Sequence, residues 1–162
     1  MTNIEQLLRE DEPAILDEAA PTIARLAHYR RDGAEATRLR IEALVRHVAR
    51  AVRARDLDDL LVHAARIARE RFAAGFDLAE VEAAFSMLED AISRRALAKL
   101  PAGELAWGLG LVGTALAHAR DELGRTFVSL APAARPGSLD LTALFNVSES
   151  RGRPVEELVY PV

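Results

Sequence analysis

Four histidines are the side chains best suited to chemistry near neutral pH, because the chain has no cysteine. They are His28, His47, His63 and His118. None has the H-E-x-x-H spacing that places two imidazoles on one helix face for zinc. His47 and His63 are about equally far from the Asp56 turn, so we expect them at similar heights on antiparallel helices. Their helical positions point away from the apolar stripes, which predicts two solvated imidazoles and no metal pair.

Two histidines suggest alternative functions. His63-Ala-Ala-Arg66 is similar to part of a histidine phosphotransfer motif, in which an exposed helical histidine accepts a phosphoryl group beside a cation, although Ile67 replaces the usual glycine. His118 flanks Trp107 and Leu111, an apolar setting that suits haem or a small apolar ligand. A phosphotransfer protein and a haem or ligand-binding protein therefore stay open as alternatives. Our main interpretation is a packed or interfacial His118 and no cofactor.

A glycine-rich string is the next candidate for chemistry. Gly108-Leu-Gly110-Leu-Val-Gly113 matches G-x-G-x-x-G, which binds pyrophosphate where a strand turns into a helix. Residues 101–106 begin a helix here and no β-α alternation occurs, so no nucleotide site is predicted. The sequence also lacks a nucleophile elbow and paired carboxylates, so we expect no catalytic residues and no enzyme.

A row of arginines, Arg46, Arg50 and Arg53, lies opposite the apolar stripe of its predicted helix. Such a row can bind an acidic partner or a phosphate backbone, but it usually forms a solvated face. The net charge of −4 argues against nucleic acid as the main partner.

The elements that carry these residues are all helical. Apolar residues recur at helical spacing up to about residue 130, and half of the 162 residues are hydrophobic, as expected for one domain. We predict an all-α bundle of five or six helices over residues 1–131. Residues 132–162 are predicted to be a linker and a short irregular C-terminal tail, with Phe145 and Tyr160 as possible docking anchors for a partner.

Neither a leader nor a membrane segment is expected. The first residues lack the basic and apolar regions of a signal peptide. The longest run without Asp, Glu, Lys or Arg is Leu105 to Ala119, shorter than the roughly 20 residues that a membrane span needs. We expect a cytoplasmic protein without membrane contact.

The last long helix, from about Ala102 to Leu130, carries two faces besides its core stripe. Gly in a helix interior costs up to about 1 kcal/mol relative to Ala, so its glycines suggest close approach of another helix. We predict that this helix lies at the bundle centre or in a dimer seam. The candidate interface residues are Trp107, Gly110, Leu111, Gly113, Ala117 and His118.

A helical hairpin is predicted at Gly75, within Arg71-Phe-Ala-Ala-Gly75-Phe76-Asp77-Leu78-Ala-Glu80-Val81. Glycine favours the left-handed conformation that ends a helix, and Asp77 with Glu80 has capping-box spacing. This run, followed by Leu88 and Ile92, resembles the helical N-terminal domain of RsbR-type stressosome proteins, the RsbT co-antagonist or RsbRD-like group.

The resemblance covers residues 4–130 and implies an all-α, globin-like bundle without haem that is usually a homodimer. It also implies a non-enzymatic regulatory or sensory module with protein partners in a bacterial stress-response pathway. Residues 132–162 are too few for the STAS domain that follows in stressosome proteins. The family supplies no catalytic residues.

Overall fold

The computed structural model describes residues 2–134, which form seven α-helices and no strand. The predicted all-α class is confirmed, but the expected count of five or six helices is wrong. The helices are α1 (Ile4–Glu10), α2 (Glu12–Ile23), α3 (Ala27–Asp32), α4 (Ala34–Ala54), α5 (Asp58–Ala73), α6 (Leu78–Lys99) and α7 (Ala102–Ala134).

The chain divides into two compact units, residues 1–127 and 128–162. Of the second unit only the last turns of α7 are described, so the account below concerns the first unit. The helix continues through the expected boundary at residue 131 to Ala134. Phe145 and Tyr160, the expected tail anchors, lie outside the described residues.

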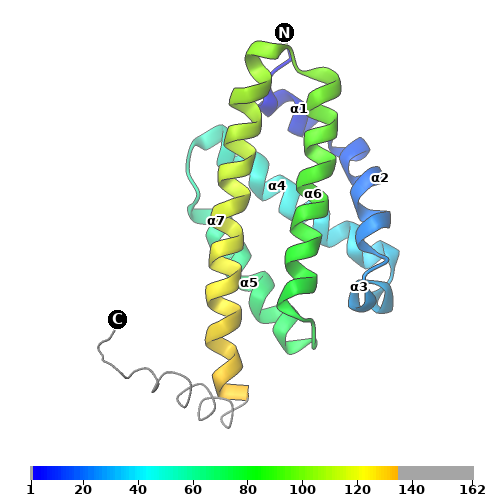
Figure 1. The fold of residues 1–162 in the computed structure, drawn as a ribbon, viewed down its shortest axis with the longest axis vertical. Coiled ribbons are helices and arrows are strands. Elements are labelled where there is room, and N and C mark those ends of the chain that lie inside the picture. Colours follow the sequence, from blue (N-terminus) through cyan, green and yellow to red (C-terminus); the bar gives the residue numbers. More distant parts are fainter. Residues whose placement is uncertain (1, 135–162) are drawn as a thin grey trace, which may run out of the picture. The chain divides into compact units, whose positions relative to one another are not determined.

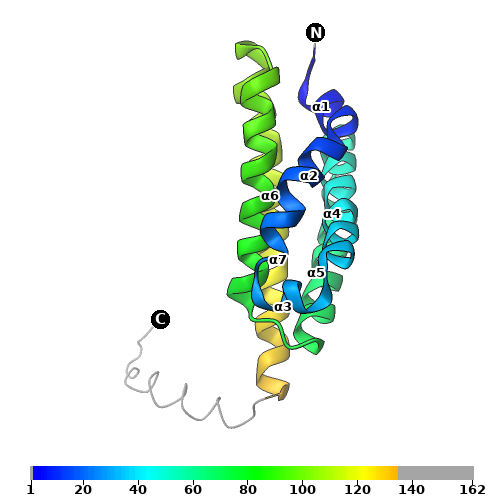
Figure 2. The same cartoon turned by 90° about the vertical axis from the view of Figure 1, so that its right-hand side faces the viewer.

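Two long hairpins enclose the core. The antiparallel helices α6 and α7 lie side by side, α4 and α5 form the second hairpin, and α2 contacts both α4 and α6 (Figure 1, Figure 2). Each helix turns one apolar face inward, as the periodicity predicts. The largest fully buried side chains come from six of the seven helices: Ile4, Leu7, Leu8, Ile15, Ile23, Leu44, Val45, Leu60, Leu88, Ile92, Leu116 and Leu123.

The additional helix arises near Pro21. A proline inside a helix tends to bend or split it, because it lacks the N–H that continues the helical ladder. The helix α2 passes through Pro21 and ends at Ile23. The chain then turns through two backbone hydrogen bonds between residues three apart, where an α-helix has four. They run from Arg25 N–H to Thr22 O and from Leu26 N–H to Ile23 O. The short helix α3 follows as a separate element.

The α5–α6 turn is built around a buried aromatic ring. Gly75 has φ +87°, as the predicted helix end requires, and the next residue, Phe76, is 3% exposed. The Phe76 ring packs against Tyr29 of α3 at a centroid distance of 4.9 Å. The buried Arg71 guanidinium lies 5.7 Å from the Phe76 ring centroid and 6.0 Å from that of Tyr29. These contacts join α3 to the turn.

The predicted capping box at this turn is wrong. Asp77 occupies the N-cap of α6, but its side chain caps no backbone N–H. The Glu80 carboxylate reaches α3 instead, where it accepts hydrogen bonds from the His28 backbone N–H and from His28 Nδ1, both at 2.6 Å. Glu80 thus fixes the start of α3, whose N-cap residue provides no side-chain cap.

Replacing Glu80 by Ala should lower the free energy of unfolding by about 1–3 kcal/mol, because two donors of His28 then lose a partly buried acceptor. Glu82→Ala is the control, since Glu82 has no hydrogen bond or ion pair within residues 2–134. Urea denaturation followed by circular dichroism measures both variants. Equal stability of the two variants would contradict this assignment.

One glycine of α7 is required by packing inside the protein, and it is Gly108. A Cβ at Gly108 would lie 2.8 Å from the Ile4 Cβ, so α1 could not keep its place. A Cβ at Gly110 would meet nothing within 4 Å. The close approach expected for the glycines is therefore intramolecular at Gly108, and Gly110 needs another explanation.

These two positions give opposite expectations for the same substitution. Gly108→Ala should destabilise the fold by about 1–3 kcal/mol through the clash with Ile4. Gly110→Ala should be neutral or stabilise it by up to about 1 kcal/mol through helix propensity. Thermal denaturation of both variants at one protein concentration, low enough that the predicted dimer is dissociated, checks the pair. A Gly108→Ala variant as stable as wild type would show that α1 can shift away at no energetic cost, and would contradict the packing requirement at Gly108.

Candidate functional site

An exposed, uncharged surface on α7 is the first candidate site. It comprises Trp107, Gly110, Thr114, Ala117 and His118, and we call it the α7 face. Trp107 is 59% exposed, which is unusual for so large a side chain. All five residues fall within the run from Leu105 to Ala119 that contains no Asp, Glu, Lys or Arg. The described chain therefore leaves this face open.

The six predicted interface residues are close to one another but not equally exposed. Trp107, Gly110, Ala117 and His118 are exposed, whereas Leu111 and Gly113 are partly buried. Leu111 lines a pocket of about 210 Å³ with Val52 and Arg55. A Cβ at Gly113 would lie 3.6 Å from Glu89 Oε2 of α6, which is ordinary contact. The face is not at the bundle centre, which was one of the two expectations for this helix.

Trp107 and His118 do not form an enclosed ligand site within the described chain. Both side chains are exposed on α7. The Trp107 ring has a cation as its neighbour, because the Arg55 guanidinium carbon lies 5.9 Å from the ring centroid. A pocket that holds haem buries most of the ligand surface. This geometry gives little support to a haem site at His118.

The histidines of α4 and α5 form a stacked pair. The His47 and His63 ring centroids are 3.9 Å apart and the ring planes differ by 5°. Their predicted similar heights are confirmed, but the expectation of two solvated imidazoles is wrong. His47 Nδ1 hydrogen-bonds to the Ala43 carbonyl at 2.8 Å. Both ring nitrogens of His63 are buried, with no hydrogen-bond partner in the described chain.

The surroundings of His63 keep its ring neutral. Burial, followed by the nearby charges of His47 and three arginines, lowers the pKa of His63 from 6.5 to about 4. The arginines are Arg66, Arg71 and Arg50. A phosphoryl acceptor needs a ring nitrogen that solvent and a donor can reach. The position of His63 therefore gives little support to phosphotransfer.

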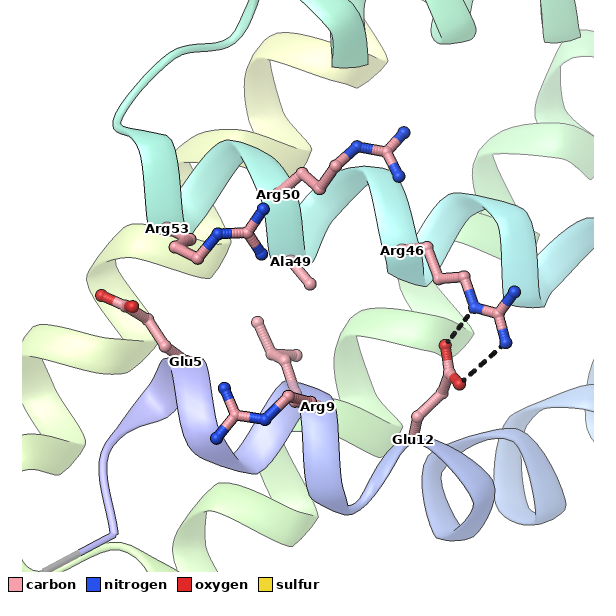
Figure 3. A pocket seen from close by; sticks show the side chains of 8 residues that line it. Glu5, Arg9, Glu12, Arg46, Ala49, Arg50 and Arg53 are labelled. Atoms are coloured by element: carbon pink, nitrogen blue, oxygen red, sulfur yellow. Dashed lines mark hydrogen bonds and ion pairs between the residues drawn. The ribbon is translucent and has the colours of Figure 1, made fainter.

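A pocket of about 310 Å³ lies between α1 and α4 (Figure 3). The Arg9 side chain runs along α1 and the Arg53 side chain along α4, on opposite sides of the pocket, and Arg50 points away from α1 (Figure 3). The pocket is lined by Glu5, Leu8, Arg9, Glu12, Arg46, Ala49, Arg50 and Arg53. The predicted arginine row thus forms one wall of a pocket.

The arginines of this pocket differ in their partners. Arg46 pairs with Glu12 at 3.0 Å and with Glu42 at 2.6 Å, and the hydrogen bond that it donates to Glu12 is the main cause that raises the pKa of Arg46. Arg50 and Arg53 have no ion pair or hydrogen bond within residues 2–134. Two cations are therefore left without a counter-charge.

Sequence reasoning missed three residues around these sites. Arg9 and Glu5 line the pocket from α1, and Arg55 connects α1 with α7, since it lies 3.6 Å from Glu5 Oε2 and over Trp107. The spacing of Glu5 and Arg9 puts both on one face of a helix, but nothing in the sequence shows that this face opposes α4. Arg55 also has φ 54°, a left-handed conformation that is rare for residues with a side chain.

No family model, no curated protein and no solved structure matches this chain. The resemblance to the RsbR-type domain therefore stays a prediction, as does the globin-like arrangement that it implies. Within residues 2–134, no helix is both long and apolar enough to cross a bilayer. The same residues contain no group of three or more His, Asp or Glu side chains arranged to hold a metal ion.

The histidine pair predicts a specific loss of stability in acid. Because the pKa of His63 is lower in the folded than in the unfolded chain, its contribution is complete above about 6.5 and is lost as the pH falls toward about 4. Melting temperatures measured across this window should fall less steeply for His63→Gln than for wild type.

His118→Gln is the matched control, because His118 is an exposed histidine on another helix. It should reproduce the wild-type slope. The assignment fails if the His63→Gln variant loses stability in acid as steeply as the wild-type protein.

Proposed function

We propose that this chain is a non-enzymatic regulatory module that acts through protein–protein contacts and forms a homodimer through the α7 face. The observation that carries this proposal is the exposed surface around Trp107 on a long helix, whose own residues on that face carry no charge. The central part of a protein interface is depleted of charge and enriched in aromatic residues, which is the composition of this face.

Gly110 supports the same contact. The fold does not require a glycine there, since a side chain would meet nothing within 4 Å. A glycine at this position makes the helix less stable than an alanine would. Close packing of a second helix against Gly110 and Ala117 explains why a residue without a side chain stands there. A twofold axis brings identical patches together, and an uncharged patch then meets its copy without repulsion.

The resemblance to RsbR-type domains supports a signalling role and a dimer, with a globin-like bundle as the expected fold. The two alternatives have weaker support from the geometry. His118 is exposed, which disfavours a haem site, and the ring nitrogens of His63 are buried, which disfavours phosphotransfer.

An arginine in the α7 face should abolish the dimer. Ala117→Arg places a charge on each protomer at the same point of a twofold contact, so light scattering after size exclusion should give the monomer mass. Wild type should give twice that mass at high micromolar concentration. Gly110→Leu should likewise weaken self-association.

Ser86→Arg is the control, because Ser86 is exposed in the middle of α6 and lies off the α7 face. This variant should remain dimeric. Circular dichroism must show the same helix content in all variants. A monomeric wild type, or a dimeric Ala117→Arg variant, would refute the α7 contact.

A further inference from the structure

The pocket between α1 and α4 has no part in the α7 contact, and it contains arginines without a counter-charge. We propose that it binds a small amphipathic acid, with the anionic group at Arg9 and Arg53 and the apolar part against Ala49 and the methylene groups of the arginines. A short-chain or aromatic carboxylate has this chemistry.

The cations of the pocket are the first support. Arg46, Arg50 and Arg53 follow one another on α4 at spacings of four and three residues, and like charges at these spacings repel. Glu12 and Glu42 neutralise Arg46, but Arg53 has no partner in the described chain. Arg9 has only a 3.8 Å pair with the exposed Glu10. A bound anion would relieve this repulsion.

The acids of the pocket do not prevent anion binding. Glu12 accepts hydrogen bonds from Arg46 Nε and Nη2, and the residues that line the pocket include four arginines against two glutamates. Glu5 lies 3.6 Å from Arg55 and belongs to that pair. The remaining charge of the pocket is positive. Arg9 and Arg53 line the pocket from different helices, and a guanidinium group donates paired hydrogen bonds to a carboxylate.

The base of the pocket is apolar, which distinguishes it from a simple ion site. Leu8 at the base is 1% exposed, so the apolar surface open to a ligand comes from Ala49, which packs against the hydrophobic core, and from the methylene groups of the arginines. The small side chain at position 49 leaves room between the longer arginines on either side. The volume of about 310 Å³ is at the lower end of the range for small-molecule sites. The ligand is therefore small and carries one apolar group.

Isothermal titration calorimetry of the full chain tests this site with three probes: octanoate, octanol and inorganic phosphate. Octanoate should bind, and the other two should bind at least about tenfold more weakly, because each has only one of the two required groups. Octanol binding as tightly as octanoate would indicate adsorption to apolar surface and overturn the proposal. Phosphate binding as tightly would reduce the pocket to an ion site and also overturn it.

Substitutions then locate the binding. Arg53→Gln and Arg9→Gln should each raise the Kd for octanoate about tenfold. Ala49→Phe should block it by filling the apolar base. Arg30→Gln is the control, since Arg30 is an exposed arginine of α3 outside the pocket. Octanoate affinity that is unchanged in the two pocket arginine variants, or that falls equally in Arg30→Gln, would place binding elsewhere and refute the site.

Discussion

The contact between α3 and the α5–α6 turn is the constraint on which the arrangement of the helices depends. Phe76 lies beside Tyr29 and the buried Arg71, and Glu80 holds the first residues of α3. A short helix has little stability of its own, so α3 exists because these partners order it. Its position sets where α4 begins after Gly33, and the turn sets where α6 begins. The first helix of each hairpin, α4 and α6, therefore begins next to this cluster.

Ion pairs connect the first two helices to the rest of the bundle. These two helices are acidic, and their carboxylates pair with arginines and a lysine of α4 and α6. Burial opposes ionisation of Asp11, but hydrogen bonds from Arg95 and Lys99 hold its pKa below the usual value. Other pairs join Asp17 to Arg38 and Glu18 to Arg94. Exposed pairs contribute little energy individually, so their effect is mainly to orient α1 and α2. Arg50 and Arg53 of α4 have no ion pair within the described residues, and both line the pocket.

The sequence predicts the parts of this fold that depend on local rules. Helical periodicity located α4, and the left-handed preference of glycine located the turn at Gly75. The same local rules failed for Glu80, whose spacing from Asp77 is that of a capping box but whose carboxylate binds His28, 52 residues away. A local pattern cannot show that a distant donor offers a better geometry.

The candidate sites could be predicted only in part, for the same reason. The row of Arg46, Arg50 and Arg53 is visible in the sequence, whereas its apposition to Arg9 depends on the packing of α1. The heights of His47 and His63 followed from their distances to the turn. Their stacking did not, because it depends on the rotation of α4 and α5 about their axes. The spacing of residues predicts how far along a helix a side chain lies. It predicts less reliably which neighbouring helix that side chain contacts.

The helix α1 connects the two surfaces discussed above. Its Ile4 packs over Gly108 so closely that no side chain fits there, and its Glu5 pairs with Arg55, whose guanidinium carbon lies 5.9 Å from the Trp107 ring centroid. Arg9 of the same short helix lines the pocket on the other side. The same seven-residue helix thus carries Ile4, Glu5 and Arg9. Because Ile4 packs against α7 and Arg9 lines the pocket, the pocket and the α7 face share α1 as a common structural element, and the pair of Glu5 with Arg55 joins that helix to the surroundings of Trp107.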